Sequence, residues 1–423
     1  MAVKGNRSLH VLLPTMGSAG DVHPFIALGV ALRARGHRAT ILTNPIFQEI
    51  IEAQGIGFLP VGTAAEANAA IANPELWHLR KGFKVIAQVI VPAIAEIYKL
   101  IEQHADADTV VAFSSLAFGA RVAQEKLKVP SASVHLQPSV IRTFADQGMM
   151  GNVRLSASRP KWFKQGLFRL IDSLILDRRI KEPLNALRAT LGLKPVDRVM
   201  HRWIHSPQLV IAFFPAWFAA PQPDWPPNTH AVGFPLWDAD GETPLPPDAE
   251  EFLSSRAAPL IFTPGSAGAT MQRFFKESVD AARELHLPAM LVTNYPEQVP
   301  KNLPRDIGVF GYLPFSQVLP RAALLVYHGG VGTLAQGIKA GIPHLVVPHG
   351  YDQFDSGWRI EQLKLGRSIP QSRYRARRVV RAIDGILGDG ASTQRCREFA
   401  SRIDSADAVA RACTLIEGLA PVG

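Results

Sequence analysis

The sequence has few cysteines and no extended apolar leader. Its only two cysteines, Cys396 and Cys413, are too few for a disulfide framework and lack metal-ligand spacing. The apolar run at residues 11–13 stops at Pro14, which is too short for the core of a signal peptide. We therefore expect a cytoplasmic protein in a reducing compartment.

Long hydrophobic runs are also absent. The most apolar long stretch, residues 85–101, is interrupted by Gln88, Pro92, Glu96 and Lys99. A bilayer requires about 20 consecutive apolar residues, so this stretch is not a membrane span. We interpret it as a helix that is buried or lines a groove.

Acidic residues are outnumbered, 36 against 45 lysines and arginines, which gives a net charge of +9. Two explanations stay open: a solvated basic surface, or attraction to anionic phosphates and the inner surface of a membrane. The basic clusters at 178–181 and 373–378 lack the aromatic interleaving of nucleic-acid readers. We expect no nucleic-acid partner.

At 423 residues, with 47% hydrophobic and 19% charged residues, the chain is long enough for two domains with large cores. Short β-branched runs alternate with amphipathic segments in both halves, which predicts parallel sheets covered by helices. We expect strands at 9–13, 38–43, 57–61, 109–112, 131–135, 209–214, 260–263, 289–293, 307–310, 323–327 and 344–347. We expect helices at 24–35, 47–54, 118–126, 271–285 and 333–340, and one long helix from about 393.

Between the two halves, residues 215–248 contain nine prolines. Such density excludes a regular helix or a central strand. The predicted fold class is thus α/β with two Rossmann-like domains facing each other across a cleft. We expect an N-terminal acceptor-binding domain (1–235), a linker (236–248), a C-terminal nucleotide-sugar-binding domain (249–395) and a C-terminal helix (396–423) that crosses back.

A glycine-rich turn follows the strand at 323–327. It reads His328-Gly-Gly-Val-Gly-Thr333 and opens a helix, where free amides and the helix dipole attract phosphate. We expect the amides of Gly330, Val331, Gly332 and Thr333 to bind a diphosphate. His328 would donate a hydrogen bond to it and add charge if protonated, although a structural turn histidine is the alternative.

The next strand ends in a second polar loop, at the sheet edge where open α/β sheets bind ligands. Asp352 and Gln353 offer acceptors and an amide for sugar hydroxyls, and Tyr351 adjoins them. The alternative for Asp352 is a helix N-cap.

Two further loops at this edge complete the predicted donor pocket. Ser266 would reach a phosphate, while Tyr312 and Leu313 would hold a pyrimidine by stacking and main-chain hydrogen bonds. We add Ser18 from the N-terminal domain to the donor-binding residues.

The first strand leads into Gly17-Ser-Ala-Gly-Asp21, a weak dinucleotide signal. The second strand ends in Thr43-Asn44, without the acidic residue that recognises ribose, which argues against NAD. Asp21 would instead face the donor and take a proton from an acceptor hydroxyl. His23 is the second candidate base, and a helix N-cap is the alternative for Asp21.

Together, Gly17–Asp21, His328–Thr333 and Asp352-Gln353 resemble the inverting, metal-independent GT-B glycosyltransferases of family 1. Many members have Gly-His-x-x-Pro after the first strand, whereas this chain has Gly20-Asp-Val-His-Pro24, as in the sterol and glycopeptide branch. That resemblance implies Asp21 as base.

A closer resemblance is to the rhamnosyltransferase B subunits of bacterial rhamnolipid biosynthesis. It rests on segments such as Trp203-Ile-His-Ser-Pro-Gln208, Phe214-Pro-Ala-Trp-Phe218 and Gly233-Phe-Pro-Leu236. It implies transfer of L-rhamnose from dTDP-L-rhamnose to a 3-(3-hydroxyalkanoyloxy)alkanoate, a hydroxy fatty acid acceptor. Phe83, Phe113, Phe118 and Trp162 would line the acceptor groove, although core packing explains each of them singly.

The expected co-substrate is a nucleotide sugar, with no other cofactor and no metal. Peripheral association with the inner membrane, or with a synthase that makes the acceptor, is a further expectation. Three alternatives stay open: a UDP-glucose-dependent glucosyltransferase acting on a sterol or other lipid, a nucleotide-sugar 2-epimerase, and a lipid-binding or regulatory module.

Overall fold

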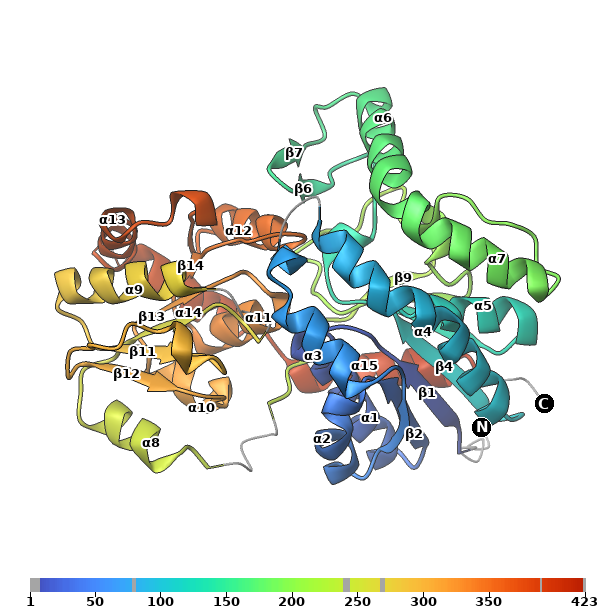
Figure 1. Ribbon diagram of the computed structural model, residues 1–423, viewed down its shortest axis with the longest axis horizontal. Helices are drawn as coiled ribbons and strands as arrows, with labels where there is room; N and C mark the ends of the chain where they lie inside the picture. Colours follow the sequence, from blue (N-terminus) through green and yellow to red (C-terminus); the bar gives the residue numbers. More distant parts are fainter. Residues whose placement is uncertain (1–7, 78–80, 239–243, 267–270, 389, 421–423) are drawn as a thin grey trace.

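The computed structural model describes residues 8–77, 81–238, 244–266, 271–388 and 390–420. It is an α/β structure with two parallel sheets in two domains, as the alternating pattern predicts (Figure 1). No helix in the described part of the chain has both the length and the apolar character needed to span a bilayer.

The N-terminal sheet has seven parallel strands in the order β3-β2-β1-β4-β5-β8-β9. Beside the central strand β4 lies β1, where Leu12 pairs with Thr40 of β2 and Val111 of β4. The strands are β1 (His10–Pro14), β2 (Arg38–Thr43), β3 (Gly57–Pro60), β4 (Thr109–Ser114), β5 (Ser131–His135), β8 (Leu209–Ala212) and β9 (Thr229–Ala231).

Helices cover both faces of this sheet because buried side chains alternate along each strand. Val11 and Leu13 pack on the side of α1, while Leu12 packs on the side of α4 and α5. The helices are α1 (Ala19–Ala34), α2 (Gln48–Ala53), α3 (Ala64–Ala72), α4 (Gly82–His104), α5 (Phe118–Leu127), α6 (Lys161–Ile171) and α7 (Glu182–Thr190), with 3₁₀ turns η1 (Pro45–Phe47), η2 (Pro74–Trp77) and η3 (Pro138–Val140) and π-helical segments η4 (Asp172–Lys181) and η5 (Val199–Trp203).

The C-terminal sheet has six parallel strands in the order β12-β11-β10-β13-β14-β15. These are β10 (Leu260–Thr263), β11 (Ala289–Val292), β12 (Ile307–Phe310), β13 (Leu324–Tyr327), β14 (His344–Val346) and β15 (Gly366–Ser368). Its helices are α8 (Pro247–Ser254), α9 (Gln272–Leu285), α10 (Phe315–Val318), α11 (Val331–Ala340), α12 (Gln353–Gln362), α13 (Ala376–Leu387), α14 (Ala391–Ala400) and α15 (Ser405–Glu417), with 3₁₀ turns η7 (Pro296–Gln298), η8 (Leu319–Arg321) and η9 (Gln371–Arg373).

The long helix expected from about 393 is wrong. Two helices, α14 and α15, are separated by a break at which Asp404 caps α15 by accepting a hydrogen bond from the amide of Asp407. The last helix packs against α1 of the N-terminal domain, where Glu417 accepts hydrogen bonds from Arg35 and contacts His37 at 3.0 Å. One hydrophobic core cluster therefore includes residues from both domains.

In the described part of the proline-rich region between the sheets, the short edge strand β9 is the only strand before α8 begins at Pro247. Prolines are tolerated at such edge and first-turn positions. Part of the expected linker, residues 239–243, lies outside the described residues. No pattern in the sequence predicted the antiparallel hairpin of β6 (Gly148–Met150) and β7 (Val153–Leu155), which contacts α12 of the C-terminal domain.

A candidate active site between the two domains

Loops at the carboxyl ends of strands in both sheets meet between the domains. The helices that follow β1 and β13 approach so closely that a Cβ atom on Gly332 would lie 4.0 Å from the Cα atom of Gly20. On the same interface, the hydroxyl of Tyr351 donates a hydrogen bond of 2.5 Å to the carbonyl of Leu76. Residues far apart in sequence thus line one interdomain site.

Asp21 is held by the first turn of α1. Its Oδ2 atom accepts hydrogen bonds from the amide (2.8 Å) and the hydroxyl (3.2 Å) of Ser18, the residue before the helix. Ser18 is the N-cap and Asp21 is the third residue of α1 in a capping box, so the N-cap alternative for Asp21 is wrong in position. The contacts described for Asp21 all use Oδ2, which leaves Oδ1 for another partner.

Gly17 makes room for this carboxyl group. Its φ angle is +138°, and a Cβ atom there would lie 2.2 Å from Oδ2 of Asp21. Only glycine adopts this backbone without strain and without displacing the carboxyl group. Burial raises the pKa of Asp21, while its two hydrogen bonds from Ser18 act in the opposite direction.

His23 contacts a different part of the molecule. Its ring stands edge-on to Trp237 with centroids 4.9 Å apart, and it has a hydrogen bond to the Trp237 backbone. Burial lowers the pKa of His23 to about 4, so the ring is neutral at pH 7. His23 therefore contacts the segment that joins the domains.

The turn after β13 leaves free amides at the start of α11. This helix begins at Val331, two residues before the predicted position, with Gly330 as N-cap. Its first intrahelical bond runs from the amide of Leu334 to the carbonyl of Gly330 (2.9 Å). The amides of Val331, Gly332 and Thr333 thus have no acceptor within the helix and are available to an anion.

His328 lies beside these amides and is neutral. Burial and the neighbouring His349 lower the pKa of His328 to about 3, which corrects the expectation that it adds positive charge. Its Nδ1 atom is buried without a hydrogen-bond partner. The ring is packed so closely that a Cβ atom on Gly265, whose φ angle is +87°, would lie 2.5 Å from it. It can still donate one N–H bond.

Asp352 and Gln353 begin α12. Although Asp352 occupies the N-cap position, its side chain makes no capping hydrogen bond, so capping does not explain it. Burial raises its pKa to about 7, and repulsion from Asp21 and Asp355 adds to this effect. The interaction with Asp21 joins carboxyl groups from the two domains.

Gln353 differs from its predicted role. Its Oε1 atom accepts hydrogen bonds from the amides of His349 (2.8 Å) and Gly350 (3.1 Å), so it braces its own loop. Only the side-chain amide nitrogen is left for a ligand. Tyr351, with a φ angle of +54° and a bond to Leu76, ties this loop to the N-terminal domain.

Sequence reasoning missed His349 and Trp77. His349 is 6% exposed, and burial lowers its pKa to about 4, while a hydrogen bond with the Gln371 side chain acts in the opposite direction. Its ring contacts Trp77 of the N-terminal domain at 6.2 Å, and Trp77 also contacts Tyr351 at 5.8 Å. The position of His349 directly after β14, at the ligand-binding edge, was the available signal; Trp77 had none.

The other predicted donor residues occupy varied surroundings. Ser266 is exposed next to Gly265, and residues 267–270 that follow it lie outside the described residues. Tyr312 is 54% exposed, whereas the side chain of Leu313 is buried in the core. Leu313 can therefore offer a ligand only its main chain.

The predicted acceptor residues are not gathered in one groove. Phe113 and Phe118 are each 1% exposed in the N-terminal core, and Phe118 stacks on Trp203. This corrects the expectation for both, because core packing leaves them no surface for a ligand. Trp162 is 73% exposed on α6, and Phe83 is partly buried at the start of α4, next to Gly82 at the Tyr351 hydroxyl.

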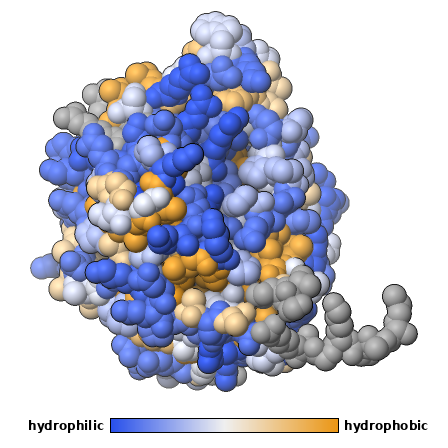
Figure 2. Space-filling view, turned by 90° about the vertical axis from the view of Figure 1, so that its right-hand side faces the viewer, coloured by the Kyte–Doolittle hydropathy of each residue, from blue (hydrophilic) through white to orange (hydrophobic). Residues whose placement is uncertain are grey.

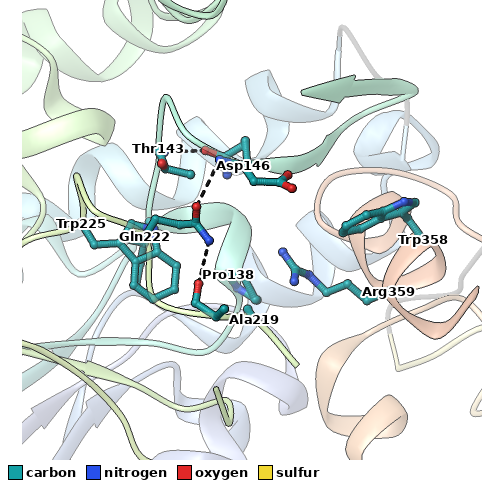
Figure 3. Close-up of a pocket in the computed structure, with 11 residues that line it drawn as sticks. Pro138, Thr143, Asp146, Ala219, Gln222, Trp225, Trp358 and Arg359 are labelled. Atoms are coloured by element: carbon teal, nitrogen blue, oxygen red, sulfur yellow. Dashed lines mark hydrogen bonds between the residues drawn. The ribbon is translucent and has the colours of Figure 1, made fainter. Parts of the chain in front are cut away.

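A cavity of about 150 Å³ opens elsewhere along the interface. Figure 3 shows Trp358 and Arg359 of α12 on one side, facing Thr143, Asp146 and Gln222 of the N-terminal domain on the other. Arg359 binds Asp355 (2.7 Å) and the carbonyl of Phe218 (2.7 Å). These bonds hold α12, and with it Asp352, against the N-terminal domain.

Within the described ranges, no three histidine, cysteine or acidic side chains gather in a way that could hold a metal ion.

Two family models match the chain. Residues 11–145 match the glycosyltransferase family 28 N-terminal domain, and residues 282–414 match the C-terminal domain of the erythromycin biosynthesis protein CIII-like family. The O-mycaminosyltylonolide 6-deoxyallosyltransferase of Streptomyces fradiae is 27% identical, over 97% of each chain. A sterol 3-beta-glucosyltransferase of Arabidopsis thaliana is 25% identical, over 90% of this chain and 61% of the relative.

Solved structures share the fold. The glycosyltransferase of kitacinnamycin superposes with a TM-score of 0.74 at 20% identity, covering 98% of this chain and all of that one. The spinosyn rhamnosyltransferase SpnG, solved with thymidine diphosphate, gives 0.66 at 19% identity, covering 96% and 99%. The predicted fold class and enzyme class are confirmed. The chain is a nucleotide-sugar glycosyltransferase of the GT-B type, with a family 28-like N-terminal domain and an EryCIII-like C-terminal domain.

Proposed function

We propose that this glycosyltransferase moves L-rhamnose from dTDP-L-rhamnose, with inversion at the anomeric carbon, to the hydroxyl of a 3-(3-hydroxyalkanoyloxy)alkanoate. The observation that carries the mechanism is the close approach of α1, which holds Asp21, to the free amides at the start of α11, where a Cβ atom on Gly332 would lie 4.0 Å from the Cα atom of Gly20. A base and a phosphate-binding turn are thus supplied by opposite domains.

Asp21 is the general base. Its Oδ2 atom is fixed by Ser18, and Oδ1 takes the proton of the acceptor hydroxyl while the hydroxyl oxygen forms a bond to the anomeric carbon. The bond between that carbon and the diphosphate oxygen breaks, and its electron pair leaves with the nucleoside diphosphate. Burial supports this role, because a raised pKa makes the Asp21 carboxylate a stronger base.

The chain's own donors balance the charge on the departing diphosphate. The amides of Val331, Gly332 and Thr333 and the dipole of α11 face it, and His328 donates one N–H bond. Ser266 adds a hydroxyl donor, while Ser18, whose hydroxyl donates to Asp21, contributes by holding that carboxyl group. Tyr312 and the main chain of Leu313 hold the nucleotide base. A neutral His328 contributes a hydrogen bond without a full charge.

Asp352 and the amide nitrogen of Gln353 bind the sugar hydroxyls, with Tyr351 closing the loop over them. For a 6-deoxy sugar, the name of the Streptomyces fradiae relative gives support, since that protein is a 6-deoxyallosyltransferase. The name of the spinosyn enzyme, a rhamnosyltransferase solved with thymidine diphosphate, supports rhamnose and the thymidine base.

We place the acceptor next to Phe83, at the start of the apolar helix α4. The runner-up is a UDP-glucose-dependent glucosyltransferase acting on a sterol, which the Arabidopsis thaliana relative favours by its name. Both functions use the same base and the same phosphate site, so only the substrates separate them. For either, we propose a cytoplasmic enzyme that needs no metal.

To test this proposal, the purified chain is incubated with each combination of nucleotide sugar and acceptor, and the products are identified by mass spectrometry. The proposal predicts a mono-rhamnosylated hydroxyalkanoyloxyalkanoate from dTDP-L-rhamnose and no product from UDP-glucose and a sterol. The reverse pattern would establish the runner-up. A new nucleotide sugar formed without any acceptor would instead indicate an epimerase and overturn both.

A further inference from the structure

Helix α6 and its π-helical continuation η4 bury two ionisable side chains beside Phe168 and expose three large apolar side chains. The face turned into the protein carries Lys164, which is fully buried, and Asp172, which is 7% exposed. The face turned to solvent carries Trp162 (73% exposed), Leu170 (54%) and Leu174 (66%). A water-exposed helix normally has the opposite arrangement.

The buried polar side chains have structural partners. The Nζ atom of Lys164 donates to the carbonyls of Phe144 (2.6 Å) and Ala145, and Asp172 forms an ion pair with Arg142 at 2.7 Å. The exposed apolar residues have no such explanation. Their spacing of eight and four residues keeps them within about 120° of arc on a helix of 100° per residue.

Basic residues surround this apolar stripe. Residues 159–202 contain eleven lysines and arginines against four acidic residues, so they carry a net charge of +7 out of the chain's +9. Arg159, Lys161, Arg169 and Arg179 of this segment are exposed. Most of the net positive charge, for which the sequence left two explanations open, is thus carried by this one segment.

A concave site of about 320 Å³ adjoins the stripe and is lined by Arg169, Asp172, Asp197 and Arg198. Its carboxylates already have basic partners, since Asp172 pairs with Arg142 and Asp197 with Lys181 (3.2 Å). Arg169 and Arg198 are therefore the groups that face a new anion. An anionic lipid headgroup has the matching charge.

In Figure 1, α6 stands at the top of the molecule beside the hairpin β6–β7, where Val153 is 41% exposed. Figure 2 shows the right-hand side of that view, on which hydrophilic residues dominate and apolar residues gather in separate patches. Helix α6 thus projects from the body of the molecule, where an extended surface can meet it.

We propose that the α6–η4 edge docks the enzyme on a bilayer that contains anionic phospholipid. Trp162, Leu170 and Leu174 enter the interfacial region, and the surrounding arginines and lysines contact the headgroups. A second copy of the chain fits less well, because a symmetric contact would bring two segments of charge +7 together. The inference does not depend on which sugar or acceptor the enzyme uses.

The test is co-sedimentation of the chain with vesicles, without nucleotide sugar or acceptor, so that it is separate from the test of the proposed transfer. We expect binding to equimolar phosphatidylcholine and phosphatidylglycerol, weakening as salt rises, and little binding to phosphatidylcholine alone. The triple variant Trp162→Ser, Leu170→Ser, Leu174→Ser should need roughly tenfold more lipid for half-binding. Ile46→Ser, a substitution of an exposed apolar residue elsewhere, should bind like the parent.

A second variant, Arg159→Gln with Arg169→Gln, keeps the proposal testable if the triple variant does not fold. It should lower the affinity for anionic vesicles by about tenfold and reduce the salt dependence. Equal binding to both vesicle types, or unchanged binding by the folded variants, overturns the proposal. So does a change of oligomeric state in the triple variant by light scattering, which would make this face a contact between copies.

Discussion

The two carboxylate oxygens of Asp21 have different surroundings. This difference explains how Asp21 can stabilise the first turn of α1 and also act as the proposed base. Oδ2 completes the capping box with Ser18, which fixes the side-chain rotamer at the start of α1. Oδ1 is left for substrate. A capping residue is thereby also a base held in a fixed position, which is what proton transfer requires.

Asp21→Asn should lower kcat by about 10²- to 10⁴-fold, because the amide retains the size of the side chain but cannot accept the proton. Its Oδ1 can still accept from Ser18, so donor affinity should be nearly unchanged. Steady-state kinetics and calorimetry with nucleotide sugar measure the two quantities separately. Near-normal turnover would exclude Asp21 as base and bring His23 back as the candidate.

Asp352 should titrate near neutral pH in the donor-free enzyme, since burial and Asp21 raise its pKa to about 7. Removing the charge with Asp21→Asn removes the repulsion, so the pKa of Asp352 should fall. Carbon-13 NMR of labelled aspartate carboxyl groups, assigned with Asp352→Asn, measures both titrations. An unchanged Asp352 titration in the Asp21 variant would mean that the two groups do not interact across the interface.

For single residues, sequence motifs indicate which residues lie at the site better than they indicate which side-chain atoms are free to bind a ligand. The motifs predicted that Asp21 and Asp352 lie at one interface. They could not predict that the side-chain carbonyl of Gln353 accepts a hydrogen bond from its own loop. The neutrality of His328 depends on burial by tertiary packing, which no local pattern encodes. The contact of the buried His349 ring with Trp77 likewise depends on tertiary packing and could not be predicted from the sequence.

At the scale of elements, strands were easier to predict than helix ends. The ranges at 38–43, 131–135, 260–263 and 307–310 match β2, β5, β10 and β12, because buried β-branched runs have few alternatives. Helix α1 was placed too late, at Pro24, although Ser18 and Asp21 form a capping box that starts it at Ala19. The hairpin β6–β7 is too short to produce a clear alternation and depends on its contact with α12.

The turn between β1 and α1 gives an element-scale prediction. Gly17→Ala should abolish most turnover, because the added Cβ would occupy the place of Oδ2 of Asp21, and should cost about 1–3 kcal/mol through backbone strain. Gly36→Ala is the matched control: its φ angle is +88°, but nothing lies within 4 Å of the added atom. Thermal unfolding and kcat are measured for both.

A loss of stability is expected in both glycine variants, and a loss of turnover only at Gly17. If Gly36→Ala lost as much activity as Gly17→Ala, strain and not the position of the carboxyl group would control catalysis. If Gly17→Ala stayed active, the geometry assigned to Asp21 would be wrong.

For the whole molecule, the domains are joined by more than the proline-rich segment. Glu417 of α15 binds Arg35 and His37, Arg359 of α12 binds the carbonyl of Phe218, and Asp355 accepts from the amide of Met149 at 2.8 Å. The sequence predicted two domains, a linker and a C-terminal helix that crosses back, but it could not predict the individual contacts, which join residues more than 100 positions apart. We expect the two domains to unfold together.

Stability should fall as pH drops from about 6.5 toward 4. Burial lowers the pKa of eight histidines, and for His328 and His344 to about 3. In this window the unfolded chain binds protons that the folded chain does not, so the free energy of unfolding decreases as pH falls. Asp21, Asp352 and Asp355 have raised pKa values and act in the opposite direction, but they are only three.

Each pKa unit of difference is worth roughly 1.4 kcal/mol, so the histidines outweigh the carboxyl groups and the net loss should amount to several kcal/mol. Urea unfolding at a series of pH values measures it as a falling midpoint. His344→Phe removes one buried histidine and should flatten the slope, whereas His230→Gln, at an exposed position, should not. A midpoint that stays constant or rises down to pH 4 would mean that the carboxyl groups dominate, or that the histidines take up protons in the folded protein.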